Sequence, residues 1–201
     1  MAAETAWRKR ELTDLVFNVR DARGSKIQTS LRSGLAMLYA HWEGWIKAVA
    51  RLYVDYVGQQ KPLLGELGAP FLGNALRVEL DRVGHANTAR VHTDFASMLV
   101  GDWTARRATV NVEFIRAESN LTSKVLRDIT TRIGIDYAPY ELLEALIDER
   151  LVAQRNSVAH GEYLAVDIAS YEDLHQKVLQ MLSTFTQDVL RAARSRAYLK
   201  A

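Results

Sequence analysis

Apolar residues recur at alternating spacings of three and four along most of the chain, a period that places them on one face of an α-helix. The clearest stretch runs from residue 27 to residue 57, contains no proline and is followed by Gly58. Its apolar seam comprises Leu31, Leu35, Leu38, Trp42, Trp45, Val49, Leu52 and Tyr56. At 1.5 Å per residue this helix would be about 45 Å long. The pattern predicts one very long helix as the spine of the molecule.

Four other amphipathic stretches have the start and stop signals of helices. A glycine just after the last apolar position is typical of a helix C-terminus. Ser170 and Asp173 have the spacing of a capping box at a helix start. The sequence therefore predicts helices over 4–23 before Gly24, from Asn120 or Thr122 to residue 133, over 139–160 before Gly161, and over about 28 residues from Ser170.

Residues 59–117 are the least regular part of the chain, because prolines and glycines interrupt the pattern. Helices are expected over 75–83 and 88–100, and residues 110–115 alternate briefly as a short strand or an extended link. The whole chain has only 3 prolines and 11 glycines, which leaves few turns for a many-stranded sheet. We expect a single all-α domain over residues 1–201, with 59–117 as a variable insertion within it.

Composition excludes several classes of function. The chain has no cysteine, so disulfides, thiol catalysis and thiolate metal sites are all absent. The 26 basic and 24 acidic residues give a net charge of +2, too small for nucleic-acid binding driven by charge alone. No apolar run is long enough for a membrane span or a signal core. These features lead us to expect a cytoplasmic protein that does not bind membranes.

No sequence motif points to a cofactor or a metal. Walker, Rossmann, Gly-x-Ser-x-Gly and His-Glu-x-x-His patterns are all missing. His85 and His92 would share one helix face only if Gly84 and Asn87 do not interrupt the helix, and surface positions are the simpler interpretation. We predict a protein that needs neither a cofactor nor a metal.

The segment 151–162 stands apart from the rest. Arg155 is followed by the polar Asn156 and, after four intervening positions, by His160 near the end of an apolar helix. This pattern resembles the Arg-x4-6-His signature of HEPN domains (higher eukaryotes and prokaryotes nucleotide-binding). A chain of this composition contains about one such match by chance. The resemblance therefore depends on the context: Gly161 and Glu162 follow, and one more long amphipathic helix ends the chain.

Two further stretches are similar to a bacterial branch of HEPN-like nucleases, the MAE type. They are Leu38–Lys47 on the long helix and Glu118–Leu126. The resemblance implies a HEPN-like helical bundle, a homodimer whose two motifs face each other, and a metal-independent endoribonuclease. It also implies a toxin–antitoxin or phage-defence role, with an antitoxin or regulatory protein as a partner. Within the first stretch, His41, Glu43 and Lys47 are either supporting site residues or surface residues.

The chemistry of RNA cleavage suits these side chains. The 2′-hydroxyl beside each phosphodiester is the nucleophile, so cleavage needs a base, an acid and a cation near the phosphate. A histidine transfers protons near neutral pH, which makes His160 the proton-transfer candidate. Arg155 would hold the phosphate through bidentate contacts, and Asn156 would orient the phosphate or the imidazole. We therefore predict Arg155 and His160 as catalytic residues and RNA as the substrate.

Geometry leaves alternatives open. Five positions along an ideal helix differ by about 140°, so Arg155 and His160 converge only if the helix unwinds near Gly161 or if two protomers share a cleft. Arg155 would instead be structural if it paired with Glu43 or Glu162, and Glu43 with Lys47 has the spacing of an ordinary helical ion pair. The alternative functions are a non-catalytic HEPN module that binds RNA, a nucleotide or a protein, and a purely structural helical dimer.

Overall fold

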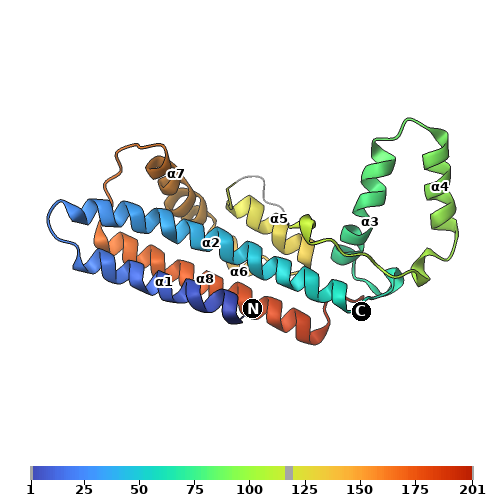
Figure 1. Ribbon diagram of the computed structural model, residues 1–201, viewed down its shortest axis with the longest axis horizontal. Helices are drawn as coiled ribbons and strands as arrows, with labels where there is room; N and C mark the ends of the chain where they lie inside the picture. The colour runs from blue at the N-terminus through green and yellow to red at the C-terminus, as the bar shows by residue number, and fades with distance from the viewer. Residues whose placement is uncertain (1, 116–119, 201) are drawn as a thin grey trace.

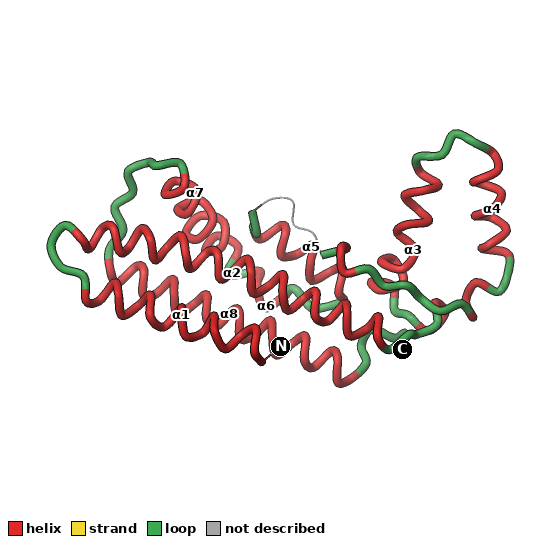
Figure 2. Tube along the Cα trace, in the orientation of Figure 1, coloured by secondary structure: helices red, strands yellow, loops and turns green. Residues whose placement is uncertain are grey.

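The computed structural model describes residues 2–115 and 120–200. This part of the chain consists of α-helices joined by loops, with short 3-10 and π-helical segments and no strand (Figure 2). The predicted all-α class is confirmed. Three long helices, α1 (Ala2–Asp21), α2 (Lys26–Gln59) and α8 (Ile168–Ser195), run side by side along the molecule (Figure 1).

The long helix α2 is the spine that the sequence predicted, with 34 residues and a length of about 51 Å. It is buried on more than one face because α1, α8 and α7 all pack against it. The seam prediction is wrong at Leu52 and Tyr56, which are each 37% exposed. The helix also continues through Gly58 before it ends. The side chains buried in this part of α2 are Tyr53, Val54 and Val57.

The least regular region forms a helical hairpin that projects from one end of the bundle (Figure 1). It consists of α3 (Ala69–Gly84) and α4 (Ala89–Val100). α3 begins before the predicted start because Pro70 occupies its first turn, where the missing N–H has no helical partner to lose. The strand alternative for residues 110–115 is wrong, since Val112–Phe114 is a 3-10 turn.

The segment before the Arg155 motif departs most from the expected single helix over 139–160. α6 (Ala138–Glu141) is one turn, and the helix resumes as a π-helical segment, η4 (Leu146–Ala153), which continues into α7 (Gln154–Ala159). A π-helix, with hydrogen bonds from i to i+5, is rare and often occurs at functional sites. The wider turn changes the direction in which the following residues project.

The cap predictions for the two neighbouring helices, α5 and α8, have different outcomes. α5 (Ser123–Ile133) starts at Thr122, whose Oγ1 accepts a hydrogen bond from Val125 N, and ends at Gly134 with φ of 67°, as predicted. The predicted capping box of α8 is wrong. Asp167 caps that helix by accepting a hydrogen bond from Ser170 N at 2.8 Å.

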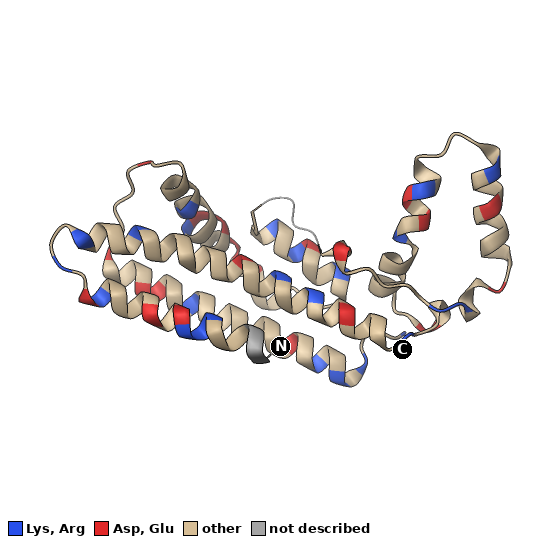
Figure 3. Ribbon diagram, in the orientation of Figure 1, with Lys and Arg blue, Asp and Glu red and all other residues tan. Residues whose placement is uncertain are grey.

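The charged side chains of both signs are mixed along the helices. Lys and Arg are interspersed with Asp and Glu along α1, α3 and α4 (Figure 3). In the described part of the chain, none of the helices combines the length and the apolar character that crossing a membrane requires.

Candidate active site at the end of α7

The last turn of α7 is closed by a motif that fixes the position of His160. Gly161 has φ of 75°, the left-handed conformation that glycine adopts without strain. Its N–H donates to Val158 O at 3.1 Å, and Glu162 N donates to Ser157 O at 2.9 Å. These two bonds make a Schellman motif, which satisfies the last carbonyls of the helix. His160 therefore occupies the C-terminal cap of α7.

Arg155 lies one and a half turns earlier and packs across the spine. Its guanidinium carbon is 3.8 Å from the centre of the Tyr39 ring on α2. Its Nη2 donates a hydrogen bond to Asn120 Oδ1 at 2.5 Å, while its Nε is buried without a hydrogen-bond partner in the described part of the chain. The electron-rich face of an aromatic ring attracts a cation and limits its freedom. Arg155 is thus held in one orientation while keeping its charge.

The structural alternative for Arg155 was an ion pair with Glu43 or Glu162. Neither pair occurs: the Glu43 carboxylate contacts Lys47, and Glu162 is tied through its backbone oxygen to Arg32 Nη2 at 2.9 Å. Among the residues that the structure describes, no carboxylate forms an ion pair with Arg155.

Asn156 belongs to the same cluster as Arg155. Asn120 Nδ2 donates a hydrogen bond to Asn156 Oδ1 at 3.1 Å, so one asparagine contacts both residues of the motif. The structure therefore brings the side chains of Arg155, Asn156 and Asn120 into one cluster.

Glu43 and Lys47 lie beside this cluster on α2. Burial raises the pKa of the Tyr39 hydroxyl to about 12, and a hydrogen bond with the Glu43 carboxylate adds to the shift. The Tyr39 hydroxyl also accepts a hydrogen bond from Leu121 N at 2.7 Å. Tyr39 is therefore neutral near pH 7 and supports the guanidinium through its ring, not through proton transfer.

His41 does not join the cluster. It is 2% exposed and lies against α1, with its Nε2 2.8 Å from Glu11 Oε2 and its ring packed edge-on to Trp7. Burial lowers the pKa of His41, and the charge of Glu11 opposes the shift. Since His41 and Glu43 are two positions apart, a helix turns them about 200° away from each other. His41 holds α1 against α2.

His160 is exposed, and its backbone N–H donates a hydrogen bond to Asn156 O at 2.9 Å. This bond keeps His160 in helical register with Arg155, so the chain unwinds after His160 and not before it. The two side chains therefore leave α7 in directions about 140° apart. The structure does not bring Arg155 and His160 together through unwinding within one chain.

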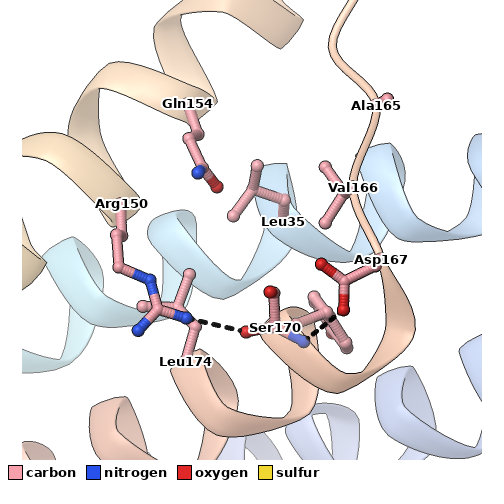
Figure 4. A pocket seen from close by; sticks show the side chains of 9 residues that line it. Leu35, Arg150, Gln154, Ala165, Val166, Asp167, Ser170 and Leu174 are labelled. Carbon is pink, nitrogen blue, oxygen red and sulfur yellow. Dashed lines mark hydrogen bonds between the residues drawn. The ribbon is translucent and has the colours of Figure 1, made fainter.

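A small cavity near α7 is separate from the motif. It has a volume of about 110 Å³, and Gln154 extends from α7 toward it (Figure 4). Arg150 borders it but is held by Asp173 Oδ2 at 2.8 Å and by Ser170 O at 3.0 Å. Neither Arg155 nor His160 lines this cavity.

Tyr39 and Asn120 belong to this cluster but were not predicted as site residues. Tyr39 lies within Leu38–Lys47, and Asn120 within Glu118–Leu126, the two stretches that carried the finer resemblance. Those stretches were the available signal. Glu118 and Ser119 of the second stretch lie outside the described residues.

The two histidines weighed as metal ligands do not share a helix. His85 caps the end of α3, where its Nδ1 is 2.7 Å from Asp81 O, and His92 lies on α4. The chain interrupts the helix between them, as Gly84 and Asn87 suggested. No three His, Cys, Asp or Glu side chains gather as a metal-ligand cluster within residues 2–115 and 120–200.

An Arg-x4-His motif at the end of a helix packed on the long spine of an all-α bundle is the arrangement of a HEPN domain. Comparison with protein-family models matches residues 3–190 to the RiboL-PSP-HEPN family, and the chain belongs to this family. Neither the curated proteins nor the solved structures contain a match. Because HEPN domains are often ribonucleases, membership points to a nuclease or another RNA-related function. The resemblance to the MAE-type branch stays a prediction.

Proposed function

We propose that this protein is a metal-independent endoribonuclease that uses Arg155 and His160. The observation that carries the proposal is the state of Arg155: its guanidinium is held by Tyr39 and Asn120, and in the described part of the chain no carboxylate pairs with it. A positioned cation that is not neutralised favours an anionic ligand, and a phosphodiester matches its planar, bidentate donors.

The reaction balances without an added co-reactant. One imidazole accepts the proton of the 2′-hydroxyl, and the 2′-oxygen forms a bond to phosphorus. The bond from phosphorus to the 5′-oxygen breaks, and a protonated imidazole gives its proton to that oxygen. Arg155 stabilises the charge that develops on the phosphate oxygens. The products are a 2′,3′-cyclic phosphate and a 5′-hydroxyl.

The divergence of Arg155 and His160 favours a site shared by two protomers. In a two-fold symmetric dimer, each α7 would bring one His160 and one Arg155 to a common cleft. Two imidazoles in that cleft would divide the work of base and acid. As part of the same proposal, the protein acts in the cytoplasm as a toxin or phage-defence effector and is controlled by an antitoxin or regulatory protein.

The test is cleavage of a fluorescent single-stranded RNA in the presence of EDTA. Wild-type protein is expected to cut it, and Arg155→Ala and His160→Ala are each expected to abolish cutting while the circular dichroism spectrum is retained. The matched control for His160 is His85→Ala, which removes another exposed histidine at a helix C-terminal cap. The matched control for Arg155 is Arg127→Ala, which removes a guanidinium 4.0 Å from the Tyr137 ring.

Three results would contradict the proposal. Loss of activity in EDTA with recovery on adding a divalent metal would reject the mechanism. Full activity of His160→Ala would reject the assignment of the base. Binding of RNA or nucleotide without cleavage by the wild type would favour the non-catalytic module.

A further inference from the structure

Asn120 contacts both residues of the Arg155–Asn156 pair from a different part of the chain, just before α5. Its Oδ1 accepts the hydrogen bond from Arg155 Nη2 and its Nδ2 donates to Asn156 Oδ1. Its own position is fixed because its backbone oxygen accepts a hydrogen bond from Thr122 N at 2.8 Å, and Leu121 N donates to the Tyr39 hydroxyl.

Donor and acceptor chemistry determines how the three side chains are turned. A guanidinium only donates, so Asn120 must present its oxygen to Arg155 and therefore its amino group to Asn156. Asn156 must then present its oxygen to Asn120. Its Nδ2 consequently points away from Asn120, and it has no acceptor among the described residues.

We infer that Asn120 is the positioning residue of the active site: it holds the Arg155 guanidinium over Tyr39 and turns the Asn156 amino group toward the substrate phosphate. This inference rests on the proposed nuclease function. It assigns to Asn156 the role of a neutral donor beside the cation, and it gives Asn120 no contact with the RNA.

The decisive comparison is Asn120→Asp against Asn120→Ala. Aspartate has nearly the same shape and still accepts from Arg155, but it neutralises the guanidinium and makes Asn156 turn its amino group inward. Alanine removes both hydrogen bonds but leaves the charge of Arg155 and its contact with Tyr39. A positioning role therefore makes aspartate the more harmful change for activity, whereas a purely structural role makes alanine the more harmful one.

We expect kcat for single-stranded RNA to fall about 10-fold in Asn120→Ala and about 100-fold in Asn120→Asp, because small misplacements of catalytic groups have effects of this size. KM should change less than kcat in both variants. The melting temperature should follow the opposite order, with Asn120→Asp the more stable of the two. Activity that falls more in the alanine variant would overturn the inference.

Asn74 provides a matched control at the other end of the bundle. It is 3% exposed, and its amide likewise accepts from and donates to one neighbour, Asn111, at 3.1 and 3.3 Å. Asn74→Asp should lower the melting temperature and leave kcat of the folded protein unchanged. An equal loss of kcat in Asn74→Asp and Asn120→Asp would overturn the positioning role.

A second measurement separates this inference from the nuclease proposal. A fluorescent single-stranded oligonucleotide with 2′-O-methyl groups cannot be cleaved by 2′-hydroxyl attack, so its binding is measured separately from cleavage. If the wild type binds this probe but does not cut RNA, the nuclease proposal fails by itself. The positioning inference then still expects at least 10-fold weaker binding in Asn120→Asp than in Asn120→Ala. Equal affinities, or no binding by the wild type, would overturn it.

Discussion

Arg155 and His160 belong to one short helix, yet they lie in opposite environments. Arg155 is held by groups from α2 and from the segment before α5, whereas the imidazole of His160 is exposed at the end of α7. The difference indicates a division of labour. In the proposed function, the cation that would bind the phosphate is held by the fold of one chain, while the proposed proton-transfer group is exposed, where the substrate and a second copy of the chain would reach it.

The largest expected effect is on the cleavage rate, which both substitutions should lower, whereas only one of them should lower stability. We predict that His160→Ala and Arg155→Ala each lower the cleavage rate by about 10²–10⁴-fold, the range for lost acid–base or electrostatic groups. Only Arg155→Ala should also lower stability, by about 1–2 kcal/mol, because it loses a charged hydrogen bond and a cation–π contact. Cleavage assays and thermal unfolding of the same preparations test both parts. Equal melting temperatures for the two variants would contradict the difference in environment.

Mixing the two inactive variants, Arg155→Ala and His160→Ala, tests whether two protomers together form the active site. If subunits exchange at random, about half of the dimers are mixed, and each mixed dimer keeps one Arg155 and one of the two His160 imidazoles, whereas each variant alone lacks both copies of one of these residues. We predict that the mixture cuts RNA at least about 10-fold faster than either variant alone.

The control for this experiment is a mixture of Arg155→Ala with the double variant Arg155→Ala/His160→Ala, which supplies no intact arginine. Recovery there would show that cleavage does not need Arg155. No recovery in the first mixture after verified subunit exchange would reject a site completed by one Arg155 and one His160 from different protomers.

Substitutions of Tyr39 test which part of its side chain holds the Arg155 guanidinium. Tyr39→Phe and Tyr39→Leu both lose the hydroxyl that accepts from Leu121 N, but only the leucine variant loses the ring beneath Arg155. We predict that the rate stays within about threefold of wild type for phenylalanine and falls about 10-fold for leucine, since a cation–π contact contributes about 0.5–2 kcal/mol. Steady-state kinetics measure the ratio. A larger loss for phenylalanine would show that the hydroxyl, and not the ring, supports the site.

Features that depend on local sequence patterns were predicted, whereas contacts between distant residues were not. The spine, the all-α class and the Gly161 cap follow from local periodicity and from glycine at a helix end, and all three are confirmed. Arg155 and Asn156 were predicted from one short motif. Asn120 and Tyr39 were not, because their contacts with Arg155 join positions 35 and 116 residues away, and no local pattern encodes such a contact.

Two errors have physical causes that the sequence did contain. His41 was grouped with Glu43, although two positions on a helix face nearly opposite sides. The second error is the prediction of an α-helix where the structure has a π-helical segment. Its buried residues, Leu146 with Leu151 and Ile147 with Val152, repeat every five positions, which fits hydrogen bonds from i to i+5. The cap of α8 lies three residues before the predicted Ser170, because the Asp167 side chain accepts from Ser170 N.

The smallest predicted effect concerns His175, a buried histidine that stabilises the fold, in contrast to the exposed His160. His175 on α8 is 7% exposed, and its Nε2 is 2.8 Å from Leu12 O on α1. Burial lowers the pKa of His175, with Arg20 acting in the same direction and Glu172 and the Leu12 carbonyl opposing it. The unfolded chain therefore binds the proton more readily than the folded one. This contribution to stability is complete above the ordinary pKa of histidine, about 6.5, and is lost as the pH falls below it.

We predict that His175→Gln, which can still donate a hydrogen bond but does not titrate, reduces the drop in melting temperature between pH 7.5 and pH 5.5 by a few degrees. For a chain of this size, 1 kcal/mol corresponds to roughly 2–4 °C. The rest of the drop should persist, because the buried His41 titrates in the same direction. His160→Ala should remove the cleavage activity. If His175→Gln removed the cleavage activity and His160→Ala did not, the proton-transfer role would belong to His175. The proposed roles of the two histidines would then be wrong.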